Sequence, residues 1–203
     1  LQQIGKEYQK AFLFQKAFTA FQEALVLAEK TRVDGEIQLN LLFGLAYTCL
    51  DARNFAEALS YIAKGEMLLE NQPAHLLHGH FLHLRGMVYQ LQRNWPESLA
   101  NYQKALEWNQ KTGNEYALGN TYHQIGMVYQ LQRNWPESLA NYQNALECYE
   151  KTGNEYELGG TYHQIGMVHQ LQRNWPESLA NYRKALECKE KTGNEYALGS
   201  TYH

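Results

Sequence analysis

The stretch Asn134–Tyr142, with the sequence NWPESLANY, decides the fold of this chain because it occurs three times. The copies begin at Asn94, Asn134 and Asn174, so they are 40 residues apart. A second segment, Thr112–Tyr116 (TGNEY), returns at the same interval. A fixed period of this length is typical of a solenoid, in which each repeat buries its apolar face against the next.

Each repeat contains two amphipathic segments with helical spacing, and no segment has the period of a strand. In the repeat 114–153, the first apolar stripe consists of Leu118, Tyr122, Ile125, Gly126 and Tyr129, and the second of Trp135, Leu139, Tyr142, Ala145, Leu146 and Tyr149. The sequence therefore predicts a pair of helices in every repeat.

The ends of these helices are marked by capping residues. Asn134 precedes Pro136 and Glu137, which predicts that its side chain caps the second helix in a capping box. Gly153 is predicted to end that helix in the left-handed conformation. Asn154 is then placed to cap the first helix of the next repeat.

The small and aromatic residues at these spacings resemble the tetratricopeptide repeat family, in the long-repeat form of the kinesin light chains and of bacterial signalling proteins. The pattern reads Gly86, Tyr89, Ser98, Tyr102, Ala105 in the third repeat; Gly126, Tyr129, Ser138, Tyr142, Ala145 in the fourth; and Gly166, His169, Ser178, Tyr182, Ala185 in the fifth. It returns as Gly5, Tyr8, Ala17, Phe21, Ala24 in the first repeat, and as Gly44, Tyr47, Ala58, Ile62, Gly65 in the second, with two extra residues that we assign to the turn.

The resemblance implies an all-α fold, a right-handed superhelical solenoid of antiparallel helix pairs over the single array 1–203. The expected repeats are 1–34, 35–73, 74–113, 114–153 and 154–193, with a partial sixth at 194–203. Serine replaces the family's preferred alanine at Ser98, Ser138 and Ser178.

In this family the first helix of each repeat lines a concave groove that holds a peptide or a partner helix. The corresponding residues of this chain are His80, His83, Met87, Gln90 and Leu91; Asn120, His123, Met127, Gln130 and Leu131; and Gly160, His163, Met167, Gln170 and Leu171. We expect these side chains to face away from the packing stripe that contains Tyr122 and Gly126. The basic clamp with which some family members hold a C-terminal carboxylate is absent.

The histidines and methionines of this groove have alternative interpretations. His83, His123, His163 and His203 recur with the repeat, which suggests a metal-binding or pH-sensing ladder or, as we favour, simple duplication. His75, His78, His80 and His83 could contain a two-histidine metal site, but no third ligand is evident. Met87, Met127 and Met167 are either an adaptable apolar strip or half-buried filler. We expect the series Trp95, Trp135 and Trp175 to lie in the core.

Composition favours an interaction module over other function classes. The formal net charge is −3, which gives no basic footprint for nucleic acid, and no apolar run could span a membrane. No catalytic motif or cofactor motif is present. We therefore expect a cytoplasmic protein–protein interaction scaffold, part of a larger bacterial signalling protein. The alternatives are an RNA-binding helical repeat and the sensor arm of an enzyme whose catalytic domain lies elsewhere.

Two features concern the thiols and the end of the chain. Cys49, Cys148 and Cys188 are an odd number without a secretory signal, so we expect reduced thiols. The segment from Glu195 to His203 begins a first helix without a partner, and we expect it to dock through Leu198 and Tyr202. An apolar edge left there predicts weak end-to-end self-association.

Overall fold

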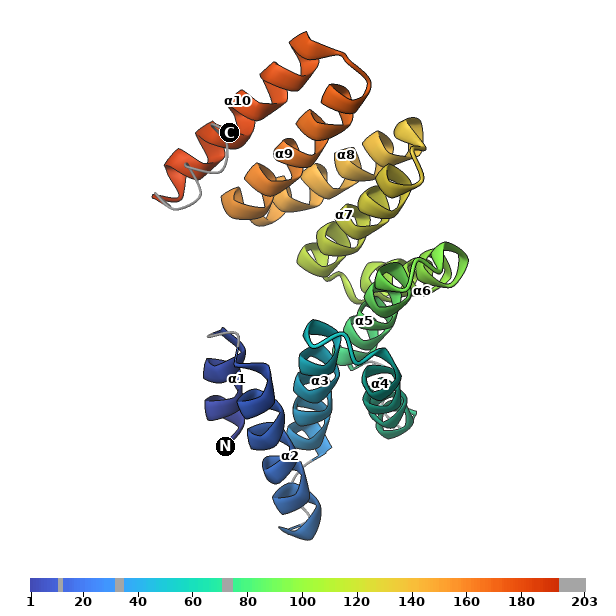
Figure 1. Ribbon diagram of the computed structural model, residues 1–203, viewed down its shortest axis with the longest axis vertical. Coiled ribbons are helices and arrows are strands. Elements are labelled where there is room, and N and C mark those ends of the chain that lie inside the picture. The colour runs from blue at the N-terminus through green and yellow to red at the C-terminus, as the bar shows by residue number, and fades with distance from the viewer. Residues whose placement is uncertain (11–12, 32–34, 71–74, 194–203) are drawn as a thin grey trace. The chain divides into compact units, whose positions relative to one another are not determined.

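The computed structural model describes residues 1–10, 13–31, 35–70 and 75–193. Within these ranges the chain forms ten α-helices and no strand (Figure 1), which confirms the predicted all-α fold. The helices are α1 (Gln2–Lys10), α2 (Phe14–Thr31), α3 (Gly35–Asp51), α4 (Phe55–Leu69), α5 (Leu77–Leu91), α6 (Trp95–Thr112), α7 (Glu115–Leu131), α8 (Trp135–Thr152), α9 (Glu155–Leu171) and α10 (Trp175–Lys191).

The helices form consecutive pairs, so that each of the five expected full repeats contains a first and a second helix. The packing divides the chain into two compact units, Leu1–Lys104 and Ala105–His203. Helices α1 to α5 belong to the first unit and α7 to α10 to the second, whereas α6 contributes to both. In the second unit α7 packs along α8 and α9 along α10.

Some of the helix caps predicted from the sequence are present in the structure, and one is absent. The side chains of Asn114 and Asn154 accept hydrogen bonds from the N–H groups of Ala117 and Glu157, and Gly153 ends α8 with φ of 65°. Both predictions are confirmed. The predicted side-chain cap by Asn134 is wrong, since Asn134 starts α8 without such a bond. Pro136 removes one of the two N–H groups that a cap of this kind uses.

Each pair in the repeated region packs a tyrosine ring onto a glycine. A Cβ atom added at Gly126 would lie 2.7 Å from the ring of Tyr142, so only glycine permits this approach. The Ser138 hydroxyl donates a 2.9 Å hydrogen bond to the carbonyl of Gly126. The same serine bond occurs in the third and fifth repeats. This bond explains the serine where the family prefers alanine.

The second repeat differs from its predicted alignment. Its turn, residues 52–54, is as long as the turn 92–94, and α3 has the same 17 residues as α7, so the second repeat contains no extra residues. Arg53 and Arg93 share a positive φ, which fixes the register of the two turns. Counting back from them, Ala46 and not Gly44 occupies the place of Gly86, and Ala46 is fully buried. The predicted placement of the extra residues in the turn is therefore wrong.

Some expectations fall outside this description. The partial sixth repeat, with Leu198, Tyr202 and His203, lies outside the described residues. No helix in the described part is long and apolar enough to cross a membrane.

Candidate functional site

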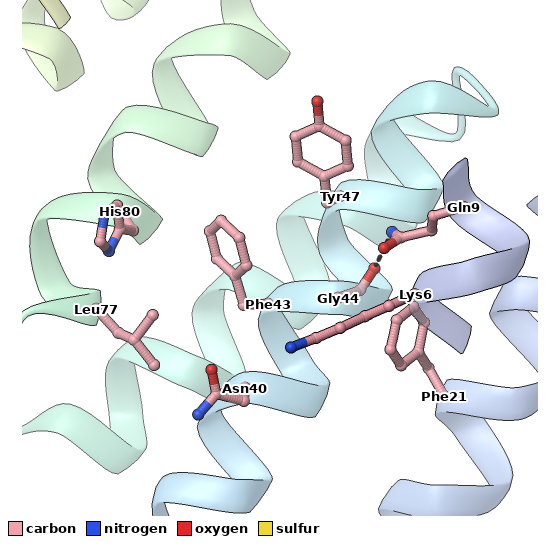
Figure 2. A pocket seen from close by; sticks show the side chains of 9 residues that line it. All are labelled: Lys6, Gln9, Phe21, Asn40, Phe43, Gly44, Tyr47, Leu77 and His80. Atoms are coloured by element: carbon pink, nitrogen blue, oxygen red, sulfur yellow. Dashed lines mark hydrogen bonds between the residues drawn. The ribbon is translucent and has the colours of Figure 1, made fainter. Parts of the chain in front are cut away.

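A pocket of about 470 Å³ lies in the first unit, where three first helices come together (Figure 2). Its lining residues are Lys6 and Gln9 from α1, Phe21 from α2, Asn40, Phe43, Gly44 and Tyr47 from α3, and Leu77 and His80 from α5. Six of these side chains present mainly carbon: those of Phe21, Phe43, Tyr47, Leu77, the Lys6 stem and the His80 ring edge. The pocket therefore combines an apolar floor with a few polar groups.

The corrected register of α3 brings three lining residues to positions that match the expected groove of the later repeats. With Ala46 aligned to Gly126, Asn40, Phe43 and Tyr47 fall at the groove positions of Asn120, His123 and Met127. His80 is the one lining residue that the sequence analysis placed in the groove. The lining residues of α1 and α3 were not among the groove residues named from the sequence, and in α3 the misaligned register hid them.

Aromatic contacts hold the wall of the pocket. The ring of Phe43 meets the rings of Phe81 and His80 edge to face, with centroids 5.5 and 6.1 Å apart. Phe81 is fully buried and closes the space above Gly65. Tyr47 stands at the border with 38% of its surface exposed. The floor is thus fixed by packing, and the border stays accessible.

The polar groups of the pocket are only partly satisfied. Gln9 donates through Nε2 to the carbonyl of Gly44 at 3.2 Å and to the hydroxyl of Thr48 at 2.6 Å. Asn40 uses its Nδ2 on the carbonyl of Glu36, four residues earlier in the same helix. Figure 2 shows the Lys6 side chain reaching across the pocket toward Asn40. Lys6 has no ion-pair partner in the described part of the chain.

His80 adds an unsatisfied nitrogen to this pocket. Its Nδ1 atom is buried and has no hydrogen-bond partner among the described residues. Burial lowers the pKa of His80 below its ordinary value, so the ring is neutral near pH 7. A neutral imidazole with a free nitrogen can exchange one hydrogen bond with a bound group.

The groove glutamines of the repeated region are tied to the packing tyrosines. The hydroxyl groups of Tyr102, Tyr142 and Tyr182 donate 2.6 Å hydrogen bonds to the Oε1 atoms of Gln90, Gln130 and Gln170, respectively. The rings of His83, His123 and His163 pack on the same three tyrosines, with centroids 5.2 to 5.4 Å apart. The prediction that His123 and Gln130 face away from the packing interface is therefore wrong.

His123 also links two consecutive repeats. Its Nδ1 atom lies 2.9 Å from the hydroxyl oxygen of Thr161, and that hydroxyl donates to the carbonyl of Glu157. Burial lowers the pKa of His123 to about 4. A second pocket, of about 400 Å³, is lined by His123 and His163 together with Tyr156, Glu157, Gly160, Gln164 and Lys189.

The remaining groove candidates differ in exposure. Asn120 accepts a 2.7 Å hydrogen bond from the hydroxyl of Tyr149, and Met87 and Met127 pack against the cores of their units. Met167 is half-buried. Leu91, Leu131 and Leu171 are exposed. These contacts support the filler interpretation of the methionines, whereas the leucines remain open to solvent.

The tryptophans and the histidine cluster also depart from expectation. Trp135 packs against the core of its unit, but Trp175 is 61% exposed, so the core assignment is wrong for Trp175. His75 precedes α5, and its Nδ1 accepts a hydrogen bond from the N–H of Leu77. In the described residues, no three His, Cys, Asp or Glu side chains are grouped as metal ligands would be. The three cysteines are buried free thiols.

A known family model matches the repeated region of the chain. The tetratricopeptide repeat family model matches residues 79–151 and, in a second overlapping match, residues 117–191. Together the two matches cover more than half of the chain. A comparison with curated proteins gives no match.

Solved structures share the fold at low sequence identity. The aspartyl phosphate phosphatase F from Bacillus subtilis matches with a TM-score of 0.88 and 14% identity, over 98% of this chain and 52% of that chain. BtubC from P. vanneervenii matches with a TM-score of 0.77 and 17% identity, over 94% and 78%. A putative kinesin light chain from Podosopora anserina with nearly identical repeats gives 0.70 and 15%, over 96% and 95%. The chain thus spans about half the length of the Bacillus phosphatase.

Proposed function

We propose, from the premise that this chain belongs to the tetratricopeptide repeat family, that it is a protein–protein interaction scaffold holding a peptide or a partner helix on its first helices. The observation that carries the proposal is the pocket between α1, α3 and α5. All of its lining residues except Phe21 are on the first helices of three consecutive repeats, and its floor is apolar. An extended segment can bury a side chain there while its backbone bonds to Asn40 and His80.

The groove residues of the later repeats have a structural part in this proposal. Met127 packs against the core of its unit, and Met87 does the same in the first unit. Leu131 and Leu171 are exposed, but the proposal assigns them no contact with the partner. His83, His123, Gln130 and Gln170 contact the tyrosines that pack between the helices.

We propose that the scaffold works in the cytoplasm as part of a larger signalling protein. Support comes from the three buried free thiols, which suit a reducing compartment. A catalytic role for the chain itself is not part of the proposal.

Selection from a random peptide phage library on the immobilised full chain tests this function. We expect enriched peptides that bind the wild-type chain and lose binding to Asn40→Trp, whose indole fills the pocket. Asn141→Trp, on the exposed face of α8, is the matched control and should bind normally. Failure to enrich any peptide, or equal binding by both variants, would contradict the claim that the groove holds the partner.

A further inference from the structure

The two units of the chain use their groove side chains differently. In α7 the polar groove residues are committed internally: Asn120 to Tyr149, His123 to Thr161, and Gln130 to Tyr142. These bonds join neighbouring helices within the repeat or to the next one. A partner would have to replace them, which lowers the net gain from any new hydrogen bond. The groove of α7 is therefore built for packing between repeats.

The pocket of the first unit has the opposite character. Lys6 carries an ammonium group without an ion-pair partner in the described residues. The Oδ1 atom of Asn40 and the Nδ1 atom of His80 have no hydrogen-bond partner in the same part of the chain. Figure 2 shows that Lys6 and His80 approach the pocket from opposite sides, from α1 and α5. A bound segment thus meets one positive charge, neutral polar groups and the ring of Phe43.

Sequence divergence coincides with this difference. The repeats 114–153 and 154–193 share 34 of 40 residues, whereas the first two repeats match them only in the spacing of small and aromatic positions. Phe43 and Tyr47 stand where the later repeats have histidine and methionine. The residues that make the pocket apolar and open are thus particular to the first part of the chain.

Building on the proposed function, we infer that the pocket between α1, α3 and α5 selects a partner segment with an apolar side chain beside a carboxylate. Residues 114–193 are then a spacer that does not contact the partner. The apolar side chain packs on Phe43, Phe21 and Leu77. The carboxylate pairs with Lys6 at the rim, and Asn40 and His80 bond to the segment's backbone. A basic segment is disfavoured because the pocket offers no carboxylate among its lining residues.

Fluorescence polarisation with three labelled short peptides tests the chemistry on the full chain. All have a glycine–serine background; the first carries leucine next to aspartate, the second leucine next to lysine, and the third serine next to aspartate. We expect only the first to bind well. Lys6→Ala should weaken its binding roughly threefold, as expected of a rim ion pair, and added salt should have the same effect. Lys104→Ala, at an exposed position of α6, is the matched control and should change nothing.

Deletion of residues 114–153 tests the spacer role, because it joins Gly113 to Asn154 and recreates the native junction sequence. The affinity for the leucine–aspartate peptide should stay within twofold. Met127→Glu in the intact chain is a second test that does not rely on refolding of a shortened array, and it should also leave the affinity unchanged.

Three results overturn the inference. One is equal binding of the aspartate and lysine peptides, and another is an unchanged affinity in Lys6→Ala. The third is loss of binding in Met127→Glu while Asn40→Trp binds normally. In that third case the proposed function remains, but the partner binds at a different site. Failure of the phage selection would instead contradict the proposed function itself.

Discussion

The hydroxyl of Tyr142 donates a 2.6 Å hydrogen bond to Oε1 of Gln130, and so ties a buried ring of α8 to a groove residue of α7. The pair recurs as Tyr102 with Gln90 and as Tyr182 with Gln170. The three copies lie in different surroundings, since the first is buried, the second half-buried and the third exposed. The chain therefore contains its own series for measuring this bond.

Replacing the glutamine should destabilise the chain in proportion to this burial. We expect Gln90→Ala to cost about 1–3 kcal/mol of unfolding free energy, because it strands a buried hydroxyl, and Gln130→Ala somewhat less. Gln170→Ala should cost under about 0.5 kcal/mol. Urea denaturation followed by circular dichroism measures all three. Equal effects at the three positions would show that the tyrosine–glutamine bond does not contribute in this way.

Two glycines should respond to alanine with opposite sign. Gly126→Ala places a methyl group 2.7 Å from the fully buried ring of Tyr142, so it should cost about 1–3 kcal/mol. Gly160→Ala meets no atom within 4 Å in the middle of α9 and should stabilise the chain by about 0.5–1 kcal/mol. Thermal melts of both variants give the comparison. A harmless Gly126→Ala would mean that the ring can move aside.

The inter-helix arginines hold a conformation that suits glycine better. Arg133 has φ of 59°, and Arg53, Arg93 and Arg173 are similar. Arg133→Gly relieves the steric cost of this region and should raise the unfolding free energy by about 0.5–1 kcal/mol. The same change at Arg183, inside α10, is the control and should lower it by about 1 kcal/mol. Destabilisation by Arg133→Gly would show that its side chain contributes contacts that outweigh the backbone strain.

His123 should make the chain sensitive to acid. Its pKa is lowered to about 4 in the folded chain, against an ordinary value near 6.5 when unfolded. Above pH 6.5 the ring is neutral in both states, and the free energy of unfolding is unaffected. As the pH falls below 6.5 the unfolded chain binds a proton that the folded chain resists, so stability falls by up to about 2 kcal/mol by pH 5.

Urea titrations at pH 7 and pH 5 measure this loss. His123→Phe keeps a ring on Tyr142 but cannot titrate, so it should reduce the difference between the two pH values. His75→Phe, outside the helices, is the control and should keep the wild-type difference. An unchanged difference in His123→Phe would assign the acid sensitivity to other groups.

The sequence predicted the helix pairs because glycine, serine and tyrosine recur at a spacing that only paired helices explain. It could not predict that the second repeat has no extra residues. Gly44 matches the packing glycine by residue type, and only the shared φ of Arg53 and Arg93 places Ala46 at that position instead. That error concealed Asn40, Phe43 and Tyr47 as groove residues.

The orientation of His123 was also beyond sequence reasoning. Helical spacing places it on a different stripe from Tyr122 and Gly126, and that much is true of α7 alone. Its contacts come from neighbouring helices, namely the ring of Tyr142 on α8 and the hydroxyl of Thr161 on α9. Single-helix periodicity contains no information on how those neighbours approach.

Hydrogen–deuterium exchange of the full chain, with and without a saturating phage-selected peptide, tests the central claim most directly. The account predicts slower exchange in α1, α3 and α5 around Lys6, Asn40 and His80, with α8 and α10 unchanged. Protection confined to the second helices, or to α7 and α9, would contradict the claim that the partner is held in the first-helix groove of the first three repeats.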